Sequence, residues 1–377
     1  TQNVKDFSEM FQSCGSLERF DVSNFNTENA EDMSYMFNFC DYLKELKITG
    51  FKTGKVSNFT GTFSNCYFLT EIIVSGLDTS SAITMESMFE GDNSLKSLDV
   101  SSFNTEKVKS FKGMFSGCAE LKSIDISKFS TNNAEDLSAM FQYCSSLLYV
   151  DVEKFDTSKV TNMAQMFQRC SSIKEINVGK FNTGLVTDMS QMFEECSTIT
   201  ALDVKGFNTE NVKDMSYMFY YCESIKTLDV SKFNTKNVEN MDCLFSNLNK
   251  LERLGIADWD TSKVTSMTFM FYLDSNLLEL DVSKFKTGNV KDMSYMFSEV
   301  KRVTSLDVSN FDTSNCENML GMFQNCNNLL SLDVSKFQTG KVTDMAYMFQ
   351  DCKKLTSLNV QNFDTGYCTD FYMMFNR

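Results

Sequence analysis

The chain has 377 residues, no histidine, no proline and a formal net charge of −15 at pH 7. Binding to nucleic acid or to an anionic lipid surface is disfavoured, because both need an electropositive surface and the chain has no basic block. Insertion of this segment into a membrane is also disfavoured, since no apolar run approaches the roughly 18 residues of a spanning helix.

One sequence period organises the whole chain. A phenylalanine recurs every 26 residues, from Phe11, Phe37 and Phe63 as far as Phe375. A threonine recurs at the same interval from Thr1 to Thr365, and no insertion interrupts either series. A fixed period of this length is typical of stacked repeats, in which each unit buries the apolar face of its neighbour. Residues 1–377 are therefore predicted to form a single solenoid of about fourteen and a half repeats, incomplete at both ends and without polar caps.

Each repeat begins with a predicted short strand. In the stretch 95–100, Leu98 and Val100 are apolar and alternate with Ser97 and Asp99. Alternation with a period of two predicts a half-buried strand whose apolar side chains point inward. Stacking of the repeats would join these strands into one parallel β-sheet on one face of the solenoid.

The second half of the repeat is predicted to form the opposite face. The spacing of Phe111, Met114 and Phe115 at steps of three and four favours a short helix or 3₁₀ turns over residues 105–115. Because the segment is brief and rich in valine and threonine, a short second strand over residues 108–111 is the alternative. The threonine of each repeat is predicted to be a cap or turn residue, and an exposed row of hydroxyl groups is the alternative.

Apolar residues at fixed positions of the repeat predict the core. The phenylalanine and methionine columns are expected to stack inside the solenoid rather than to hold a cofactor. Most of the 13 cysteines share one position, which other repeats fill with Asp92, Leu248, Asp274 or Val300. A residue that alternates with leucine and valine is predicted to be a small buried filler, so free thiols are favoured over disulfides or a metal site.

The repeat resembles that of a known family. The stretch from Asp151 to Cys170 reads D-V-E-K-F-D-T-S-K-V-T-N-M-A-Q-M-F-Q-R-C, and the strand before it follows the pattern L-x-x-L-D-V in most repeats. This resembles the BspA-like leucine-rich-repeat surface proteins, in the form known from mycoplasma surface lipoproteins. The resemblance implies a leucine-rich-repeat-like solenoid at a cell surface or in the extracellular space, attached to a protein or glycan ligand, and it implies no catalytic residue.

An acidic column on the strands is the candidate site for a metal ion. The outward position between the two apolar strand residues is most often aspartate, as at Asp99, Asp125, Asp151, Asp203, Asp229, Asp281, Asp307 and Asp333. Aspartates one repeat apart repel each other, so the column needs hydrogen-bond donors, neighbouring lysines or shared Ca²⁺ ions. Solvated or turn-bonded aspartate is the favoured interpretation and weak calcium binding is the alternative; no other cofactor is predicted.

Departures from the repeat are candidates for contacts with a partner. Ile73 replaces an aspartate of the acidic column, Tyr149 places an aromatic ring on a predicted strand, and Trp259 replaces a phenylalanine. Binding hot spots gather at aromatic and apolar residues on a rigid surface, so these three are the predicted partner-binding residues. Drift between redundant repeats is the alternative interpretation.

These features predict a non-enzymatic surface scaffold for adhesion or protein binding. Nucleophilic catalysis has no support, because histidine, a G-x-S-x-G motif and a glycine-rich phosphate loop are all absent from the sequence. The alternative function is a structural subunit that associates with itself end to end into an extracellular filament or sheath.

Overall fold

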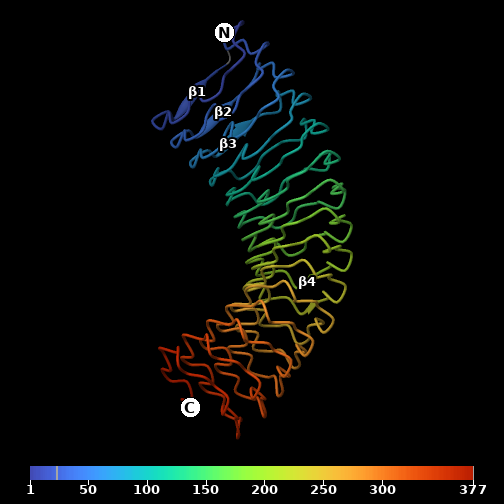
Figure 1. Ribbon diagram of the computed structural model, residues 1–377. Helices are drawn as coiled ribbons and strands as arrows, with labels where there is room; N and C mark the ends of the chain where they lie inside the picture. The colour runs from blue at the N-terminus through green and yellow to red at the C-terminus, as the bar shows by residue number, and fades with distance from the viewer. Residues whose placement is uncertain (23, 377) are drawn as a thin grey trace. The chain divides into compact units, whose positions relative to one another are not determined.

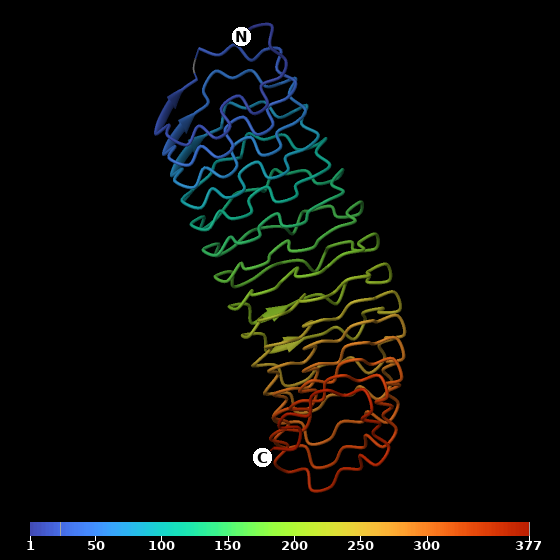
Figure 2. The same ribbon diagram turned by 60° about the vertical axis from the view of Figure 1, so that its left-hand side comes forward.

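The fold consists of repeated coils of the chain. The computed structural model describes residues 1–22 and 24–376, in two compact units, Thr1–Leu185 and Val186–Arg377. Within each unit, every coil lies beside the coil formed by the next repeat (Figures 1 and 2). Each unit is therefore a solenoid, as the repeat predicts, and the continuity of residues 1–377 in a single solenoid stays a prediction.

Short parallel strands form one face of each unit. In the first unit β1 (Arg19–Asp21), β2 (Glu45–Lys47) and β3 (Glu71–Ile73) pair in that order. In the second unit β4 (Ala201–Leu202) pairs with β5 (Thr227–Leu228). All five strands occupy the same position of the repeat, which is the predicted one.

The strand face is less continuous than the predicted single sheet. At the same repeat position, isolated parallel bridges join Ser123 to Tyr149 and Ser305 to Ser331. The predicted alternation is confirmed, because Leu98 is buried while Asp99 is exposed. The strands are short because the aspartate side chain accepts the next free backbone N–H two residues later and so starts a turn.

A second ladder of parallel bridges runs along the other side of each unit. It links one residue per coil, from Asp6 to Asn162 in the first unit and from Asp188 to Asp370 in the second. No helix occurs in residues 1–22 and 24–376, so of the two forms predicted over residues 105–115 the helix is wrong, whereas turns closed by a bond to the third residue back are present. The segment combines this bridge, which the second-strand alternative anticipates, with a run of hydrogen-bonded turns.

The turns explain why this segment has helical spacing without being a helix. The N–H groups of Phe111 and Gly113 donate to the next coil, to the carbonyl oxygens of Asp136 at 3.0 Å and Ser138 at 2.8 Å. The same segment also forms a turn within its own coil, since the N–H of Met114 donates to the carbonyl of Phe111 at 3.0 Å. Successive turns bring every third or fourth side chain to the core, and a helix does the same.

Two residues of each coil adopt the left-handed backbone conformation within these turns. Gly113 (φ 60°) and Gly117 (φ 75°) occupy the two positions in one coil, whereas Tyr35 (φ 55°) and Leu273 (φ 63°) occupy them in others. The conformation costs a non-glycine residue about 1–2 kcal/mol. Because successive coils within each unit repeat the same hydrogen bonds, the stacked array holds these residues in place.

The core is built from stacked columns of side chains. The ring of Phe141 lies 5.7 Å from the ring of Phe115 and 5.7 Å from that of Phe167, with nearly parallel planes. The methionine columns beside them are buried, as predicted. All 13 cysteines are free, and all except Cys14 and Cys368 are buried, which confirms the filler interpretation. Buried thiols of the main column also donate to a backbone carbonyl, as Cys144 does to Phe115 at 3.1 Å.

The threonine column fastens neighbouring coils together. The hydroxyl of Thr105 donates to the carbonyl of Ser130 at 3.0 Å and accepts the N–H of the same residue at 2.8 Å. The same pair of bonds recurs for Thr209 with Asn234 and for Thr313 with Gln338. These threonines are buried, so the alternative of an exposed hydroxyl row is wrong. The side chain bonds to the adjacent coil and does not cap a helix.

Two adjacent leucines provide a test of the packing. Leu329 is fully buried, whereas Leu330 is 57% exposed. Leu329→Ala is expected to lower the free energy of unfolding by about 2–5 kcal/mol, because it leaves a cavity in a stacked column. Leu330→Ala is the matched control and is expected to change it by less than about 0.5 kcal/mol. Equal losses for both variants, measured by urea denaturation, would contradict the inward orientation of Leu329.

The threonine bonds can be tested by removing only the hydroxyl group. Thr105→Val keeps the side-chain shape but leaves the half-buried N–H and carbonyl of Ser130 without their partner. The free energy of unfolding is expected to fall by about 1–3 kcal/mol. Thr105→Ser restores the hydroxyl and should recover most of the loss, which urea denaturation would measure. A serine variant as unstable as the valine variant would show that the methyl packing, not the hydrogen bonds, matters.

Candidate functional site

The acidic column is built into the turn that follows each strand. Asp99 Oδ1 accepts the backbone N–H of Ser101 at 3.0 Å, and the corresponding oxygen of Asp229 accepts the N–H of Ser231 at 3.1 Å. The same bond to the residue two positions later is made by Asp125, Asp151, Asp203, Asp281, Asp307 and Asp333. The turn-bonded interpretation of these aspartates is therefore the one that the geometry supports.

Hydrogen bonds stabilise the charged form of these carboxyl groups. The hydroxyl and the backbone N–H of Ser101 hold the pKa of Asp99 below its ordinary value. The ammonium group of Lys128 lowers the pKa of both Asp99 and Asp125, although by less than the serine bonds do. Residues 1–22 and 24–376 contain no group of three or more cysteine, aspartate or glutamate side chains arranged to hold a metal ion. Weak calcium binding by this column stays a prediction.

A hollow lies on the strand face of the second unit. It has a volume of about 670 Å³ and crosses the strand positions of successive coils. Its floor contains the edges of Leu202, Leu228 and Leu254, which are otherwise buried. Gly255 stands in the acidic column where most coils have aspartate, so no carboxyl group covers the floor there.

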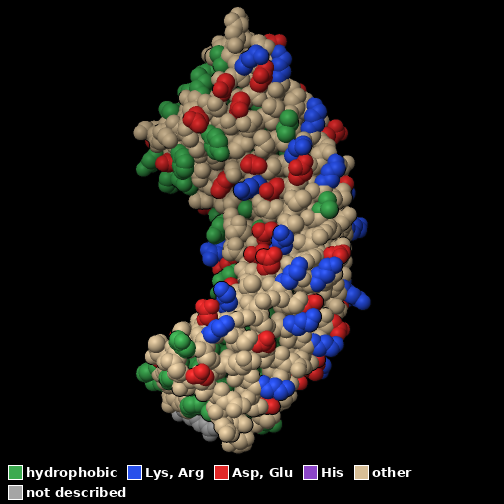
Figure 3. Space-filling model, viewed as in Figure 1, with side chains coloured by type: hydrophobic (Ala, Val, Ile, Leu, Met, Phe, Trp, Pro, Cys, Tyr) green, Lys and Arg blue, Asp and Glu red, His purple; other side chains and the backbone are tan. Residues whose placement is uncertain are grey.

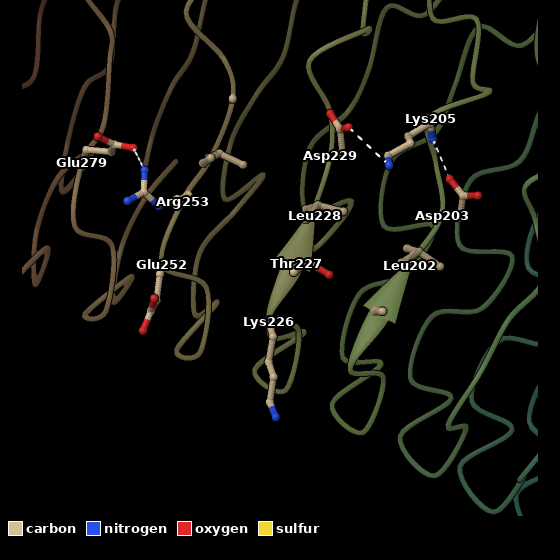
Figure 4. Close-up of a pocket in the computed structure, with 13 residues that line it drawn as sticks. Leu202, Asp203, Lys205, Lys226, Thr227, Leu228, Asp229, Glu252, Arg253 and Glu279 are labelled. Atoms are coloured by element: carbon tan, nitrogen blue, oxygen red, sulfur yellow. Dashed lines mark hydrogen bonds and ion pairs between the residues drawn. The ribbon is translucent and has the colours of Figure 1, made fainter.

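Charged side chains of both signs surround this floor, which we call the strand-face hollow (Figure 4). Lys205 Nζ lies 3.7 Å from Asp229 Oδ2, and Arg253 Nη1 lies 2.5 Å from Glu279 Oε1. In Figure 4, Lys226 projects at the opposite end of the hollow from Asp229. A leucine floor with an exposed rim of both charges is suited to a peptide segment that carries an apolar anchor and charged flanks.

The same architecture recurs at two other places on the strand face. A hollow of about 570 Å³ in the first unit is lined by β1 and β2 residues, including Phe20 and Lys47. Another, of about 550 Å³ in the second unit, includes Leu306, Leu332 and Leu358. Each hollow combines inward apolar residues with the exposed positions on either side of them. Concavity on this face is therefore a property of the repeat rather than of one coil.

The three predicted partner-binding residues differ in accessibility. Tyr149 is 47% exposed on the strand face, and Ile73 is half-buried in β3. Trp259 is only 3% exposed; its ring stacks on Phe233 at 6.3 Å, and its Nε1–H donates to the carbonyl of Val230 at 3.3 Å. The prediction that Trp259 contacts a partner is therefore wrong, because its position in the repeat points into the core.

Exposed apolar residues outside the predicted set also occur. Tyr42 and Phe68 are exposed and stack with their ring centroids 5.6 Å apart. Figure 3 shows hydrophobic side chains gathered on the coils that carry β1, β2 and β3. The rim residues Lys205, Arg253 and Glu279 were not predicted either, because ordinary charged residues at exposed positions carry no signal in the sequence. Gly255 departs from the acidic column, but hollows without a glycine occur elsewhere on the strand face, so this residue does not mark the hollow.

The single tryptophan gives a direct test of its placement. If Trp259 packs between Phe233 and Phe245, the fluorescence emission of the folded chain should be blue-shifted and only weakly quenched by acrylamide. Unfolding in urea should shift the emission to the red and restore quenching. Strong quenching of the folded chain would instead place the indole at the surface, where a partner could reach it.

Several solved structures of repeat proteins are similar to this chain. Among solved structures, a leucine-rich-repeat protein of Bacteroides ovatus has 17% sequence identity and a TM-score of 0.40, covering 85% of this chain and 73% of its own. A leucine-rich cell surface protein of Faecalibacterium prausnitzii has 15% identity and a TM-score of 0.35, with coverages of 90% and 85%. An internalin of Listeria monocytogenes has 12% identity and a TM-score of 0.22, with coverages of 88% and 87%. The predicted fold class, a solenoid of stacked coils with short parallel strands on one face, is confirmed within each unit by the strand pairing and the ladder of bridges.

The sequence comparisons identify the family. No curated protein matches the chain significantly. Within the described residues, no helix is long and apolar enough to cross a membrane. A family model described as "Mycoplasma protein of unknown function, DUF285" matches six times, over residues 1–75, 68–148, 145–254, 220–307, 241–330 and 300–377. Because these matches together extend along the whole chain, it belongs to the DUF285 family of Mycoplasma proteins.

Proposed function

We propose that the chain is a non-enzymatic scaffold at a cell surface that binds a protein partner through its strand face. The observation that carries the proposal is the strand-face hollow, where Leu202, Leu228 and Leu254 form an apolar floor inside a charged rim. Hot spots of protein interfaces form where an apolar anchor enters such a pocket and surrounding polar groups exclude water. The surface location rests on the resemblance to surface proteins with this repeat.

A binding role suits the chemistry of the side chains better than catalysis does. The chain has no histidine, and its buried cysteines are poor nucleophiles, since burial raises the pKa of Cys144 and Cys222 to about 12. The carboxylates of the acidic column are engaged by turn hydrogen bonds. A rigid core with variable exposed positions is, by contrast, the usual design of a recognition surface.

A binding experiment with matched variants tests this proposal. The immobilised chain is first offered a panel of purified extracellular proteins and a glycan array. Thr227→Arg places a bulky charge on the exposed surface of the hollow and should weaken binding to a protein partner at least about tenfold. Thr265→Arg, at an exposed position on the bridge face of the same unit, is the control and should bind as the wild type does.

Three outcomes would contradict the proposal. Equal affinity of the two variants would remove the hollow from the interface. Binding to glycans without any protein ligand would change the class of partner. Concentration-dependent growth into filaments, measured by light scattering, would favour the structural-subunit alternative, because every coil offers the same backbone hydrogen bonds to the next and therefore to a copy of itself.

A further inference from the structure

Two coils place a carboxyl group where most of the others place a thiol. Asp92 and Asp274 occupy the main cysteine position, one in each unit, and both are fully buried. An ionised carboxylate in such a site is strongly unfavourable unless it has a cation or several hydrogen-bond donors. The position in the coil that precedes or follows Asp92 holds Cys66 and Cys118, and around Asp274 it holds Leu248 and Val300, so none of these neighbours supplies a cation.

One oxygen of each carboxyl group replaces a bond of the preceding turn. Asp92 Oδ1 accepts the N–H of Cys66 at 3.0 Å, and Asp274 Oδ1 accepts the N–H of Leu248 at 2.8 Å. In an ordinary coil this N–H closes the turn onto a phenylalanine carbonyl, as Cys118 does onto Phe115 at 3.2 Å. The aspartate carboxyl group therefore takes the place of the phenylalanine carbonyl as the acceptor of this N–H.

The other carboxyl oxygen and the displaced backbone carbonyl both lack a hydrogen-bond donor. Oδ2 of each aspartate is buried and has no hydrogen-bond partner among the described residues. Within residues 1–22 and 24–376, no N–H or hydroxyl donates to the carbonyl of Phe63 or Phe245, the residues that would close the two turns. Two buried acceptors without a donor are unfavourable, and one added proton would satisfy both.

The cysteine column shows that a side chain at this position reaches that carbonyl. Cys118 Sγ donates to the carbonyl of Phe89 at 3.3 Å, and Cys352 Sγ donates to that of Phe323 at 3.1 Å. In both cases the acceptor belongs to the phenylalanine column of the preceding coil. The phenylalanines at the equivalent positions before Asp92 and Asp274 are Phe63 and Phe245, whose carbonyls lack a donor.

We propose that Asp92 and Asp274 are neutral carboxylic acids whose Oδ2–H groups donate to the carbonyls of Phe63 and Phe245, so that each acid closes a turn that opens when it ionises. The acid does the work of the cysteine thiol and of the missing turn bond together. It also makes one coil of each unit sensitive to pH, which a thiol would not do near neutrality. Burial raises the pKa of both carboxyl groups well above the ordinary value, which agrees with the geometry.

The sign of the pH dependence follows from proton binding. The folded chain keeps a proton on each of these acids over a pH range in which the unfolded chain has lost it. The stability that these two acids contribute is therefore fully present in acid and falls as the pH rises from about 4 towards their folded-state pKa. The exposed aspartates of the acidic column have the opposite sign, since their folded-state pKa is lowered and their contribution is lost as the pH falls.

Thermal unfolding of the whole chain between about pH 5 and pH 8 tests the proposal. The double variant Asp92→Asn with Asp274→Asn keeps the acceptor oxygen and supplies an N–H donor at every pH. The Tm of the wild type is expected to fall over this range by at least about 4 °C more than that of the double variant. Asp99→Asn, which changes an exposed carboxylate of the same type, is the matched control and should leave the wild-type slope unchanged.

A spectroscopic readout separates protonation from stability. At neutral pH the folded wild type should show the infrared carbonyl stretch of a protonated carboxylic acid, and the double variant should lack it. If the asparagine variant fails to fold, Asp92→Cys with Asp274→Cys uses the residue that the column already accepts and should give the same flat profile. Absence of the acid band in the folded wild type, or equal pH slopes for wild type and variants, would overturn the proposal.

Discussion

Within each of the two units, the pairing of one coil's backbone with that of the next coil is the constraint on which the structure depends. Most of the backbone hydrogen bonds between coils lie in the second ladder and the turns. On the strand face, each strand has only two or three residues. Backbone groups that a helix would satisfy within itself are satisfied here by the neighbouring coil. Since the pattern is the same in coil after coil, left-handed turn residues and buried hydroxyl groups are tolerated wherever the register places them.

The predictions from sequence succeeded where a residue's position in the repeat decides its environment. The period fixed the solenoid, the inward leucines, the buried phenylalanines and the free thiols. It could not choose between a helix and turns for Phe111 to Phe115, because both place apolar residues at the same spacing and only the hydrogen bonds distinguish them. The prediction for Trp259 was wrong because it rested on the rarity of tryptophan, whereas the position in the repeat, which points inward, decides the exposure.

The candidate site was less predictable than the fold. The hollow combines the edges of buried leucines with charged residues from several coils, and such a combination has no motif. The acidic column was visible in the sequence, but its role became clear only when each carboxylate was seen to accept the N–H two residues later. Aspartate thus performs two tasks in this chain: exposed and charged it starts a turn, and buried and neutral it is proposed to close one.

The constant coil length also bears on how such a chain changes over generations. Each kind of bond between coils recurs at its own constant sequence separation, and no insertion interrupts the series. Recombination between similar gene segments can delete or duplicate one complete repeat. Such a change would bring equivalent hydrogen-bond donors and acceptors back together. The exposed residues of the strand face can thereby be rearranged while the contacts between coils are kept.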